Sequence, residues 1–283
     1  MNSTGPALLN HHPDLAAVVD ELHALDHVRL PARSLSDVRA VQIRRIVRRI
    51  ESLLPHHGGH GERTACYALA FGEALGLSDD ELLHLRFAAL LHDIGLLTVP
   101  AGILSETRPL TGDEYAALQS HPRAAAELLE PIRFLRRAAL LIAHHHERWD
   151  GFGYPYGLRG EFIPLGSRIL AVADTFDALA ARRPAAAKVF EHETALAQLQ
   201  AVAGSQLDPD LVATFVRLAP ALRPDSSPGW GCAPHPFGRG ASLPPGPPAR
   251  PFSGKTARPA GERSKAGRPE RSTTTMNESP PRP

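Results

Sequence analysis

The chain has 283 residues, and its 31 basic and 30 acidic side chains give a formal net charge of +1. This balance gives no general reason to expect a nucleic acid or a membrane surface as partner, although small anionic ligands stay open. The two cysteines, Cys66 and Cys232, exclude a disulfide framework and favour a reducing compartment.

The N-terminal residues lack the basic and apolar regions of a secretion signal, and no run of about 18 apolar residues occurs in the sequence. We therefore expect a cytoplasmic protein. Apolar residues recur at helical spacing through most of residues 14–220, without the sustained alternation typical of β-strands. The sequence predicts an all-α fold with an N-terminal helical segment (1–55), a helical domain (56–222) and a tail (223–283).

The tail is rich in Pro, Gly, Ser and Arg and has few large apolar side chains. It cannot bury enough apolar surface to offset the entropy lost on ordering, so we expect it to be disordered.

The first clear helical pattern covers residues 38–54. Its apolar stripe consists of Ile43, Ile46, Val47, Ile50 and Leu54. The arginines at positions 44, 45, 48 and 49 lie largely outside this stripe, which is typical of a solvated helix face. The stripe permits packing on the following domain or a dimer seam, so a homodimer stays open.

The sequence "SDDE" has the form of a capping box, with Ser78 and Glu81 at the start of a helix. The apolar pattern that follows is expected to carry this helix to His92 and Asp93, with Gly95 as its stop. The histidine and the aspartate would then lie at a helix end.

A second capping box, "TGDE" with Thr111 and Glu114, predicts a helix that reaches His121. Pro122 suits the first turn of another helix, so His121 is expected at a junction between two helices.

A further helix from about residue 131 is expected to end at the histidines of "HHHERWDGFGYP", residues 144–155. The chain then turns through this glycine-rich segment. The later pattern "PLGSRILAVADTFDALA" predicts a helix with Asp174 and Asp177 on one face.

Imidazole and carboxylate groups suit divalent iron, manganese or zinc, and an aspartate flanked by histidines can bridge two ions. In this sequence the candidate metal ligands of these two types are His60, His92, Asp93, His121, His145 and Asp174. Any one of these histidines, taken singly, is more often an ordinary surface or hydrogen-bonded residue. The absence of cysteine ligands argues against structural zinc, and the wide spacing favours a site built from several helices.

The motifs "HGERTACYALAFGEALGLSDDEL", "LLHDIG", "HP", "HHERWDGFGYP" and "PLGSRILAVADTFDAL", in this order, resemble the HD-GYP branch of the HD-domain metal-dependent phosphohydrolases. The resemblance covers about residues 56–220. It implies hydrolysis of cyclic di-GMP to pGpG or GMP with bound iron or manganese. The ligands it implies are His60, His92, Asp93, His121, His145, His146 and Asp174, with Asp93 as the bridge, whereas His144 has no counterpart.

The resemblance also suggests roles beyond metal binding. We expect Asp93 and Asp177 to serve catalysis; for Asp177, orienting a ligand, moving a proton and a purely structural role all stay open. The expected substrate contacts are Arg183 and the loop residues Gly153, Tyr154 and Pro155. This loop is alternatively a rigid support for the histidine pair, and in the family it is linked with docking of diguanylate cyclase (GGDEF) domains.

The sequence departs from the family pattern in three places. Two of them remove basic side chains expected to contact phosphate, and the third changes a ligand of a third metal ion. Leu96 replaces a lysine that contacts phosphate in the family, and Ala185 and Ala186 replace a tyrosine and a basic residue, with Lys188 two positions further on. Each charge-assisted contact contributes about 1.5–3 kcal/mol, so substrate binding is expected to weaken. His56 stands where a glutamate helps to hold a third ion.

We therefore expect two metal ions, iron or manganese, in a weakened phosphodiesterase. A degenerate metal-bound docking module is the alternative.

Overall fold

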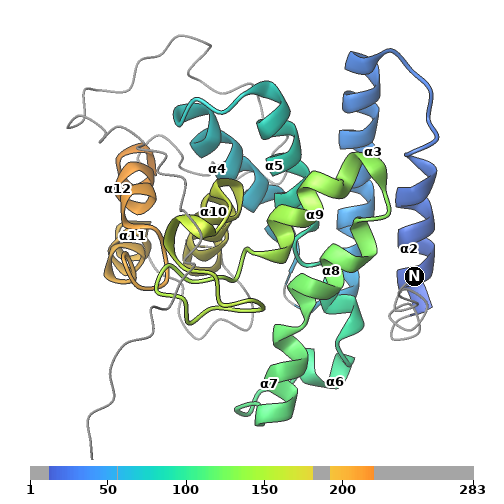
Figure 1. Cartoon of the computed structure of the whole chain (residues 1–283). Helices are drawn as coiled ribbons and strands as arrows, with labels where there is room; N and C mark the ends of the chain where they lie inside the picture. The colour runs from blue at the N-terminus through green and yellow to red at the C-terminus, as the bar shows by residue number, and fades with distance from the viewer. Residues whose placement is uncertain (1–12, 56, 181–191, 220–283) are drawn as a thin grey trace, which may run out of the picture. The chain divides into compact units, whose positions relative to one another are not determined.

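The computed structural model describes residues 13–55, 57–180 and 192–219 (Figure 1). Within these ranges the regular elements are α-helices and short 3-10 helices, with one isolated bridge between Ala203 and Leu207. The predicted all-α class is confirmed, whereas the expected tail at 223–283 lies outside the described residues. In this part of the chain no helix combines the length and apolarity needed to cross a lipid bilayer.

The described part of the chain is built almost entirely from helices. In chain order they are α2 (Pro13–Ala24), α3 (Ala32–Leu53), α4 (His60–Ala74), α5 (Asp79–Leu91), η1 (Ile94–Thr98), α6 (Ala101–Leu104), α7 (Gly112–Gln119), α8 (His121–Leu129), η2 (Arg133–Leu135), α9 (Arg136–Ala143), η3 (Gly160–Phe162), α10 (Leu165–Ala180), α11 (His192–Ala201) and α12 (Pro209–Leu218).

The helices α4, α5 and α10 form the centre of the packing, with α4 in contact with both of the others. Helices α8 and α9 pack together; α8 also contacts η1, and α9 contacts α5. On one side α2 and α3 pair, and α3 reaches α5, η1 and α4. On the other side α11 and α12 pack on α10 (Figure 1).

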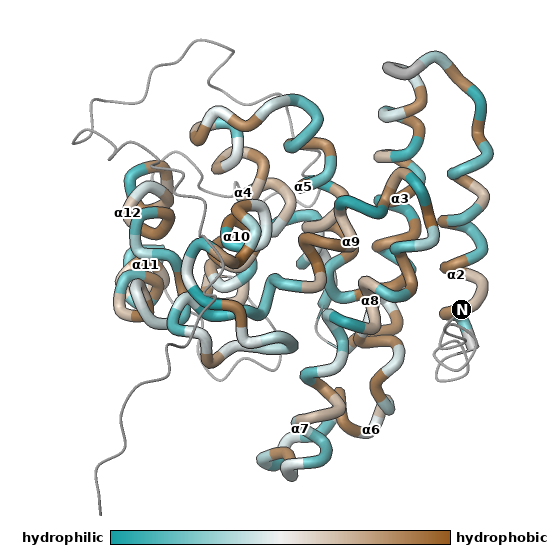
Figure 2. Tube along the Cα trace, in the orientation of Figure 1, coloured by the Kyte–Doolittle hydropathy of each residue, from teal (hydrophilic) through white to brown (hydrophobic). Residues whose placement is uncertain are grey.

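Aromatic contacts join the C-terminal helices to this centre. The ring of Phe176 in α10 lies 5.1 Å from that of Tyr67 in α4 and 5.1 Å from that of Phe215 in α12. All three side chains are buried, and edge-to-face pairs of this kind stabilise packing beyond the apolar area they bury. Figure 2 shows apolar and polar positions interleaved along the helices, as the amphipathic patterns require.

The predicted stripe of α3 is confirmed. Its five members, Ile43, Ile46, Val47, Ile50 and Leu54, are each at most 4% exposed. Two of the four arginines outside it reach neighbouring carboxylates: Arg48 pairs with Glu62 of α4, and Arg49 with Glu21 of α2.

Both capping boxes form as predicted, with Ser78 and Thr111 as N-caps of α5 and α7. The predicted stop at Gly95 is wrong, because α5 ends at Leu91 and Gly95 lies inside η1. A Cβ at Gly95 would collide with the carbonyl oxygen of His121 and lie 2.8 Å from the backbone nitrogen of Ala125. The glycine is therefore required by the close approach of η1 and α8.

Candidate metal centre

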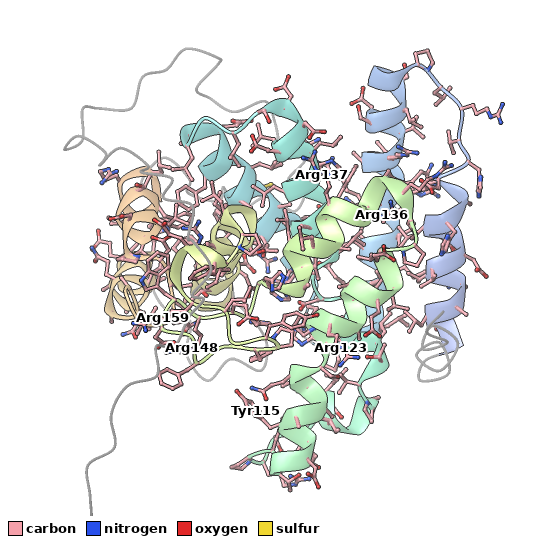
Figure 3. The ribbon with its side chains drawn as sticks, viewed as in Figure 1. Tyr115, Arg123, Arg136, Arg137, Arg148 and Arg159 are labelled. Carbon is pink, nitrogen blue, oxygen red and sulfur yellow. The ribbon has the colours of Figure 1, made fainter. Side chains whose placement is uncertain are left out.

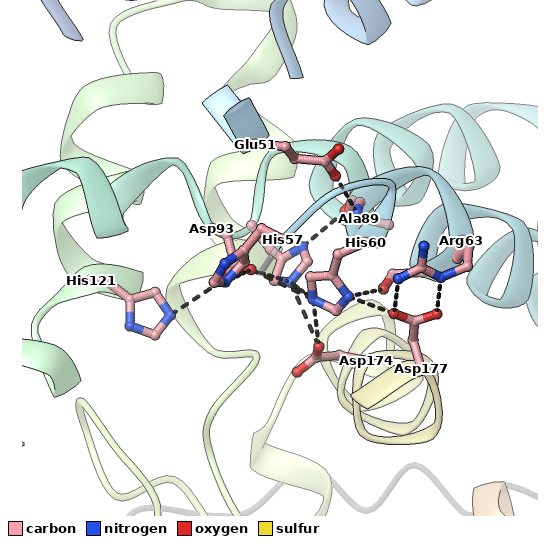
Figure 4. A network of polar contacts seen from close by, with 12 residues as sticks. Glu51, His57, His60, Arg63, Ala89, Asp93, His121, Asp174 and Asp177 are labelled. Carbon is pink, nitrogen blue, oxygen red and sulfur yellow. Dashed lines mark hydrogen bonds and ion pairs between the residues drawn. The ribbon is translucent and has the colours of Figure 1, made fainter. Parts of the chain in front are cut away.

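Histidine and aspartate side chains from five parts of the chain converge beside α4, α5 and α10. Figure 4 shows His60, Asp93, His121 and Asp174 of this group. His60 begins α4, and Asp174 lies in α10. His92 and Asp93 follow the end of α5, His121 begins α8, and His145 and His146 follow α9. The structure thus brings together all seven side chains expected as metal ligands.

Local hydrogen bonds aim three of the histidine rings. The Nδ1 atoms of His92, His121 and His145 lie 2.9, 2.8 and 2.7 Å from the carbonyl oxygen of the residue three positions earlier. A carbonyl oxygen only accepts, so Nδ1 is the donor in each ring. In the neutral ring the lone pair is then on Nε2, which is the atom directed toward the centre.

The first cluster consists of His60, His92 and Asp174, whose ligand atoms lie within 4.8 Å of one another. The Oδ1 atom of Asp174 is 3.1 Å from Nε2 of His60 and 3.7 Å from Nε2 of His92. The two Nε2 atoms face each other at 3.2 Å, a contact that needs a proton or a cation between them. Burial lowers the pKa of His60, but hydrogen bonds to Asp174 and Asp177 outweigh this effect and raise the pKa to about 10. A metal ion at this cluster would therefore have to displace a proton from the His60 ring.

The second cluster consists of His121, His145 and His146. The Nε2 atoms of His121 and His145 are buried without a hydrogen-bond partner, which is costly for a polar atom. Burial holds the pKa of His145 well below its ordinary value and lowers that of His146 to about 4. These rings stay neutral at physiological pH, and neutral imidazole is the form that binds metal.

Asp93 lies between the two clusters. Its Oδ2 atom is 3.5 Å from Nε2 of His60 and 3.3 Å from Nε2 of His92, while Oδ1 is 3.8 Å from Nε2 of His121. Burial raises the pKa of a carboxyl group, but the surrounding histidines reverse this effect and hold the pKa of Asp93 well below its usual range. The two oxygens of one ionised carboxylate therefore face different histidine groups.

These observations fit a pair of divalent transition-metal ions. The donors are imidazole nitrogens and carboxylate oxygens, and the buried Nε2 atoms without protein partners are oriented as ligands. The carboxylate between the clusters has the arrangement that bridging requires.

A further histidine at the centre was missed in the sequence. Nε2 of His57 lies 3.5 Å from Oδ2 of Asp93, in the turn before α4. His56, the histidine expected near a third ion, lies outside the described residues. Because α4 begins at His60 after Gly59 in a left-handed conformation (φ 74°), helical spacing does not apply to this turn.

Asp177 lies on the far side of His60 from the centre (Figure 4). Its buried carboxylate accepts a 2.7 Å hydrogen bond from Nδ1 of His60. It also accepts from Nε and Nη2 of Arg63, at 2.7 and 3.0 Å. Among the roles left open for Asp177, this geometry favours orienting a ligand.

The glycine-rich loop is tied to the second cluster. The backbone nitrogen of Tyr154 donates to the carbonyl oxygen of His146 at 3.2 Å, and the Tyr154 ring lies 5.0 Å from that of His146. A Cβ at Gly153 would collide with the backbone of Arg148, so the loop folds back closely on the preceding chain. Pro155 follows Tyr154 through a cis peptide bond.

Glu147 organises the same loop and was also missed in the sequence. Its buried carboxylate accepts from the backbone nitrogens of Tyr156 and Leu158, at 2.8 and 2.9 Å. The ring of His144 lies against that of Tyr156 in a tilted arrangement, with centroids 5.1 Å apart, and His144 is in neither cluster. The loop is therefore packed against the histidine pair, and the substrate contacts expected of Gly153, Tyr154 and Pro155 stay a prediction.

Of the positions that lack the basic residues of the family pattern, the structure describes only Leu96. Leu96 is buried in η1, where its side chain joins the apolar core. Arg183, Ala185, Ala186 and Lys188 lie outside the described residues.

The model of the HD domain family (HD_5) matches residues 45–211. The cyclic di-GMP phosphodiesterase response regulator RpfG of Xanthomonas campestris is 44% identical over 158 residues, covering 55% of this chain and 42% of RpfG. The 3'3'-cGAMP-specific phosphodiesterase 3 of Vibrio cholerae is 37% identical over 176 residues, covering 62% of this chain and 38% of the relative.

Two solved structures have a fold similar to that of this chain. The crystal structure of a cyclic GMP-AMP specific phosphodiesterase from V. cholerae aligns with a TM-score of 0.52 at 25% identity, over 63% of this chain and 48% of that one. An HDG"Y"P protein from Bdellovibrio bacteriovorus aligns with a TM-score of 0.50 at 16% identity, over 72% of this chain and 69% of that one. The chain matches only about two fifths of the length of the two curated relatives. The family match, the motifs and these relatives agree that the chain belongs to the HD-domain family, in its HD-GYP branch.

Proposed function

We propose that this chain is a metal-dependent phosphodiesterase that hydrolyses cyclic di-GMP, or a related cyclic dinucleotide, to pGpG or GMP. The observation that supports this best is the Asp93 carboxylate, which faces one histidine group with each oxygen. The relatives named as cyclic di-GMP and cGAMP phosphodiesterases support the substrate class.

Two iron or manganese ions, when bound, would activate water and neutralise charge on the phosphate oxygens. His60, His92 and Asp174 would hold one ion, and the second histidine cluster the other, with Asp93 shared. His57 offers one more donor beside Asp93. Asp177 and Arg63 would keep the His60 ring in the tautomer that presents Nε2.

Substrate binding is expected to be weak, because arginines close to the ligand histidines in sequence already pair with carboxylates. Arg123 in α8 donates to Glu127 at 2.8 Å, and Arg148 in the loop donates to Asp150 at 2.6 Å. Figure 3 labels both arginines. Buried Leu96 offers no charge to a phosphate. Exposed ion pairs contribute at most about 1 kcal/mol, so the missing lysine is the larger loss for phosphate binding.

The burial of Leu96 also favours a second candidate function. A domain that keeps its metal ligands without phosphate-binding cations would act as a metal-bound docking module, with a GGDEF-domain protein as the partner. Such a module would bind metal fully and hydrolyse nothing.

The test is hydrolysis of cyclic di-GMP by protein reconstituted anaerobically with Fe(II) or Mn(II), with bound metal counted and pGpG resolved from GMP. We expect turnover that needs about two ions per chain. Asp93→Ala should abolish turnover and reduce metal binding, because the shared carboxylate is lost. Full metal loading without turnover on cyclic di-GMP or cGAMP would reject the enzyme and favour the docking module.

Two adjacent histidines provide a matched control for this experiment. His145→Ala should remove a ligand and lower the metal count, whereas His144→Ala should leave the count unchanged. Equal loss in both variants would contradict the assignment of the second cluster.

A further inference from the structure

Glu51, in the last turn of α3, contacts the turn that carries the first metal-binding histidine. Its Oε2 atom accepts a hydrogen bond from the backbone nitrogen of Gly59 at 2.7 Å, and Oε1 accepts from that of Gly61 at 2.8 Å. These two N–H groups flank His60 in the chain. One carboxylate from a neighbouring helix thus fixes the backbone on both sides of His60 (Figure 4).

The first turn of α4 needs this support. The N-terminal N–H groups of a helix lack partners within the helix, and the N-cap residue, Gly59, has no side chain to supply one. Glu51 replaces the missing cap from outside. The turn before it is closed by a hydrogen bond of 2.9 Å from the nitrogen of His60 to the carbonyl oxygen of His57. The two histidines that approach Asp93 from this side therefore share one anchored segment.

The approach of α3 to this turn is close. A Cβ at Gly61 would lie 3.4 Å from Oε1 of Glu51, 3.3 Å from Cγ1 of Val47 and 3.0 Å from the carbonyl oxygen of Leu90. Glu51 itself is only 9% exposed. Burying a carboxylate is costly unless hydrogen bonds compensate for lost water. The two backbone N–H groups offset part of this cost, but burial outweighs them and raises the pKa of Glu51 above its ordinary value.

We propose that Glu51 is a positioning residue of the metal centre, holding the 57–61 turn so that His60 and His57 direct Nε2 at Asp93. It acts through the backbone and contributes no metal ligand. This inference rests on one part of the proposed function, namely that the centre binds metal. It adds that α3, N-terminal to every expected ligand, is part of the site.

Glu51 could also act only by holding α3 against α4. This packing role can be tested separately from the positioning role, because α3 makes a second polar contact with α4. Nε of Arg48 lies 3.0 Å from Oε1 of Glu62, and the Arg48 side chain is 69% exposed. This pair joins the same two helices without contacting the backbone next to His60. Arg48→Ala is therefore the matched control.

The experiment uses the full chain with Glu51→Gln, Glu51→Ala and Arg48→Ala. Glutamine keeps the size of the side chain, but its nitrogen cannot accept, so at least one N–H bond is lost. Mn(II) affinity is measured by titration, and amide hydrogen exchange of the 57–64 segment is measured in metal-free protein. We expect Glu51→Gln to weaken Mn(II) binding about tenfold or more and to speed this exchange. Arg48→Ala should change Mn(II) affinity less than about twofold.

Equal Mn(II) affinities in Glu51→Gln and wild type would overturn the proposal, as would an equal loss in Arg48→Ala. If Glu51→Ala does not fold, the glutamine variant decides the question, with thermal unfolding as its check. Wild-type protein that binds Mn(II) but hydrolyses no cyclic dinucleotide would reject the proposed function and leave this comparison intact. Wild-type protein that binds no Mn(II) would reject both, and unchanged exchange in Glu51→Gln would reject the positioning role independently.

Discussion

His60 differs from the other expected ligand histidines in how its ring is held. His92, His121 and His145 donate from Nδ1 to a carbonyl oxygen three residues back, so local helix geometry orients them. His60 donates to Asp177, 117 residues further along the chain. The ring orientation in the first cluster therefore depends on the packing of α10 against α4, and Arg63 adds to it by binding both oxygens of Asp177.

Asp177→Asn tests this dependence. The amide keeps the shape but loses the charge, and its nitrogen cannot accept from Nδ1 of His60 or from Arg63. We expect metal affinity to fall by about 10–100-fold and the free energy of unfolding to fall by about 1.5–3 kcal/mol. Mn(II) titration and chemical denaturation measure the two effects.

A lower turnover with unchanged Mn(II) affinity would contradict the orienting role of Asp177. It would favour proton transfer, the other chemical role considered in the sequence analysis.

Helix starts were predictable where the signal is local. The capping boxes at Ser78 and Thr111 lie within four residues of chain, so the sequence was enough to place α5 and α7. Gly95 was misassigned because its requirement comes from α8, which no local pattern reveals. His57 and Glu51 were missed for a related reason: their roles depend on a non-helical turn and on the approach of α3.

Gly95→Ala tests the contact between η1 and α8. The added methyl group would meet the backbone at His121 and Ala125, which cannot move as a side-chain end could. We expect a loss of about 1–3 kcal/mol in the free energy of unfolding, together with weaker Mn(II) binding as His121 shifts. Thermal unfolding and Mn(II) titration are the measurements.

Gly102→Ala is the control for this change. Gly102 lies in α6, and a Cβ there would meet no atom within 4 Å. Its stability and Mn(II) affinity should match those of the wild type. If Gly95→Ala behaved in the same way as this control, the proposed close contact would be wrong.

Across the whole molecule, the expected ligands span residues 60–174 and come from α4, α10, the start of α8 and the segments that follow α5 and α9. The segment of α3 that carries Glu51 lies within the part of the chain that matches the HD-domain family. No short stretch of the sequence contains the site. Only the packed arrangement of these helices brings the donors together, so metal binding is coupled to folding.

This coupling predicts that metal stabilises the entire fold. A ligand that binds only the folded state adds about 2.7 kcal/mol to its stability when present at 100 times its Kd. For a domain of this size we expect Mn(II) to raise the thermal midpoint by roughly 5–10 °C and a chelator to reverse the shift. Asp93→Ala should show little of this shift, because it lacks the carboxylate between the two clusters. The thermal midpoint is measured by far-UV circular dichroism, which reports loss of helix. A midpoint that does not depend on Mn(II) in the wild type would mean that the histidine clusters fold without a metal centre.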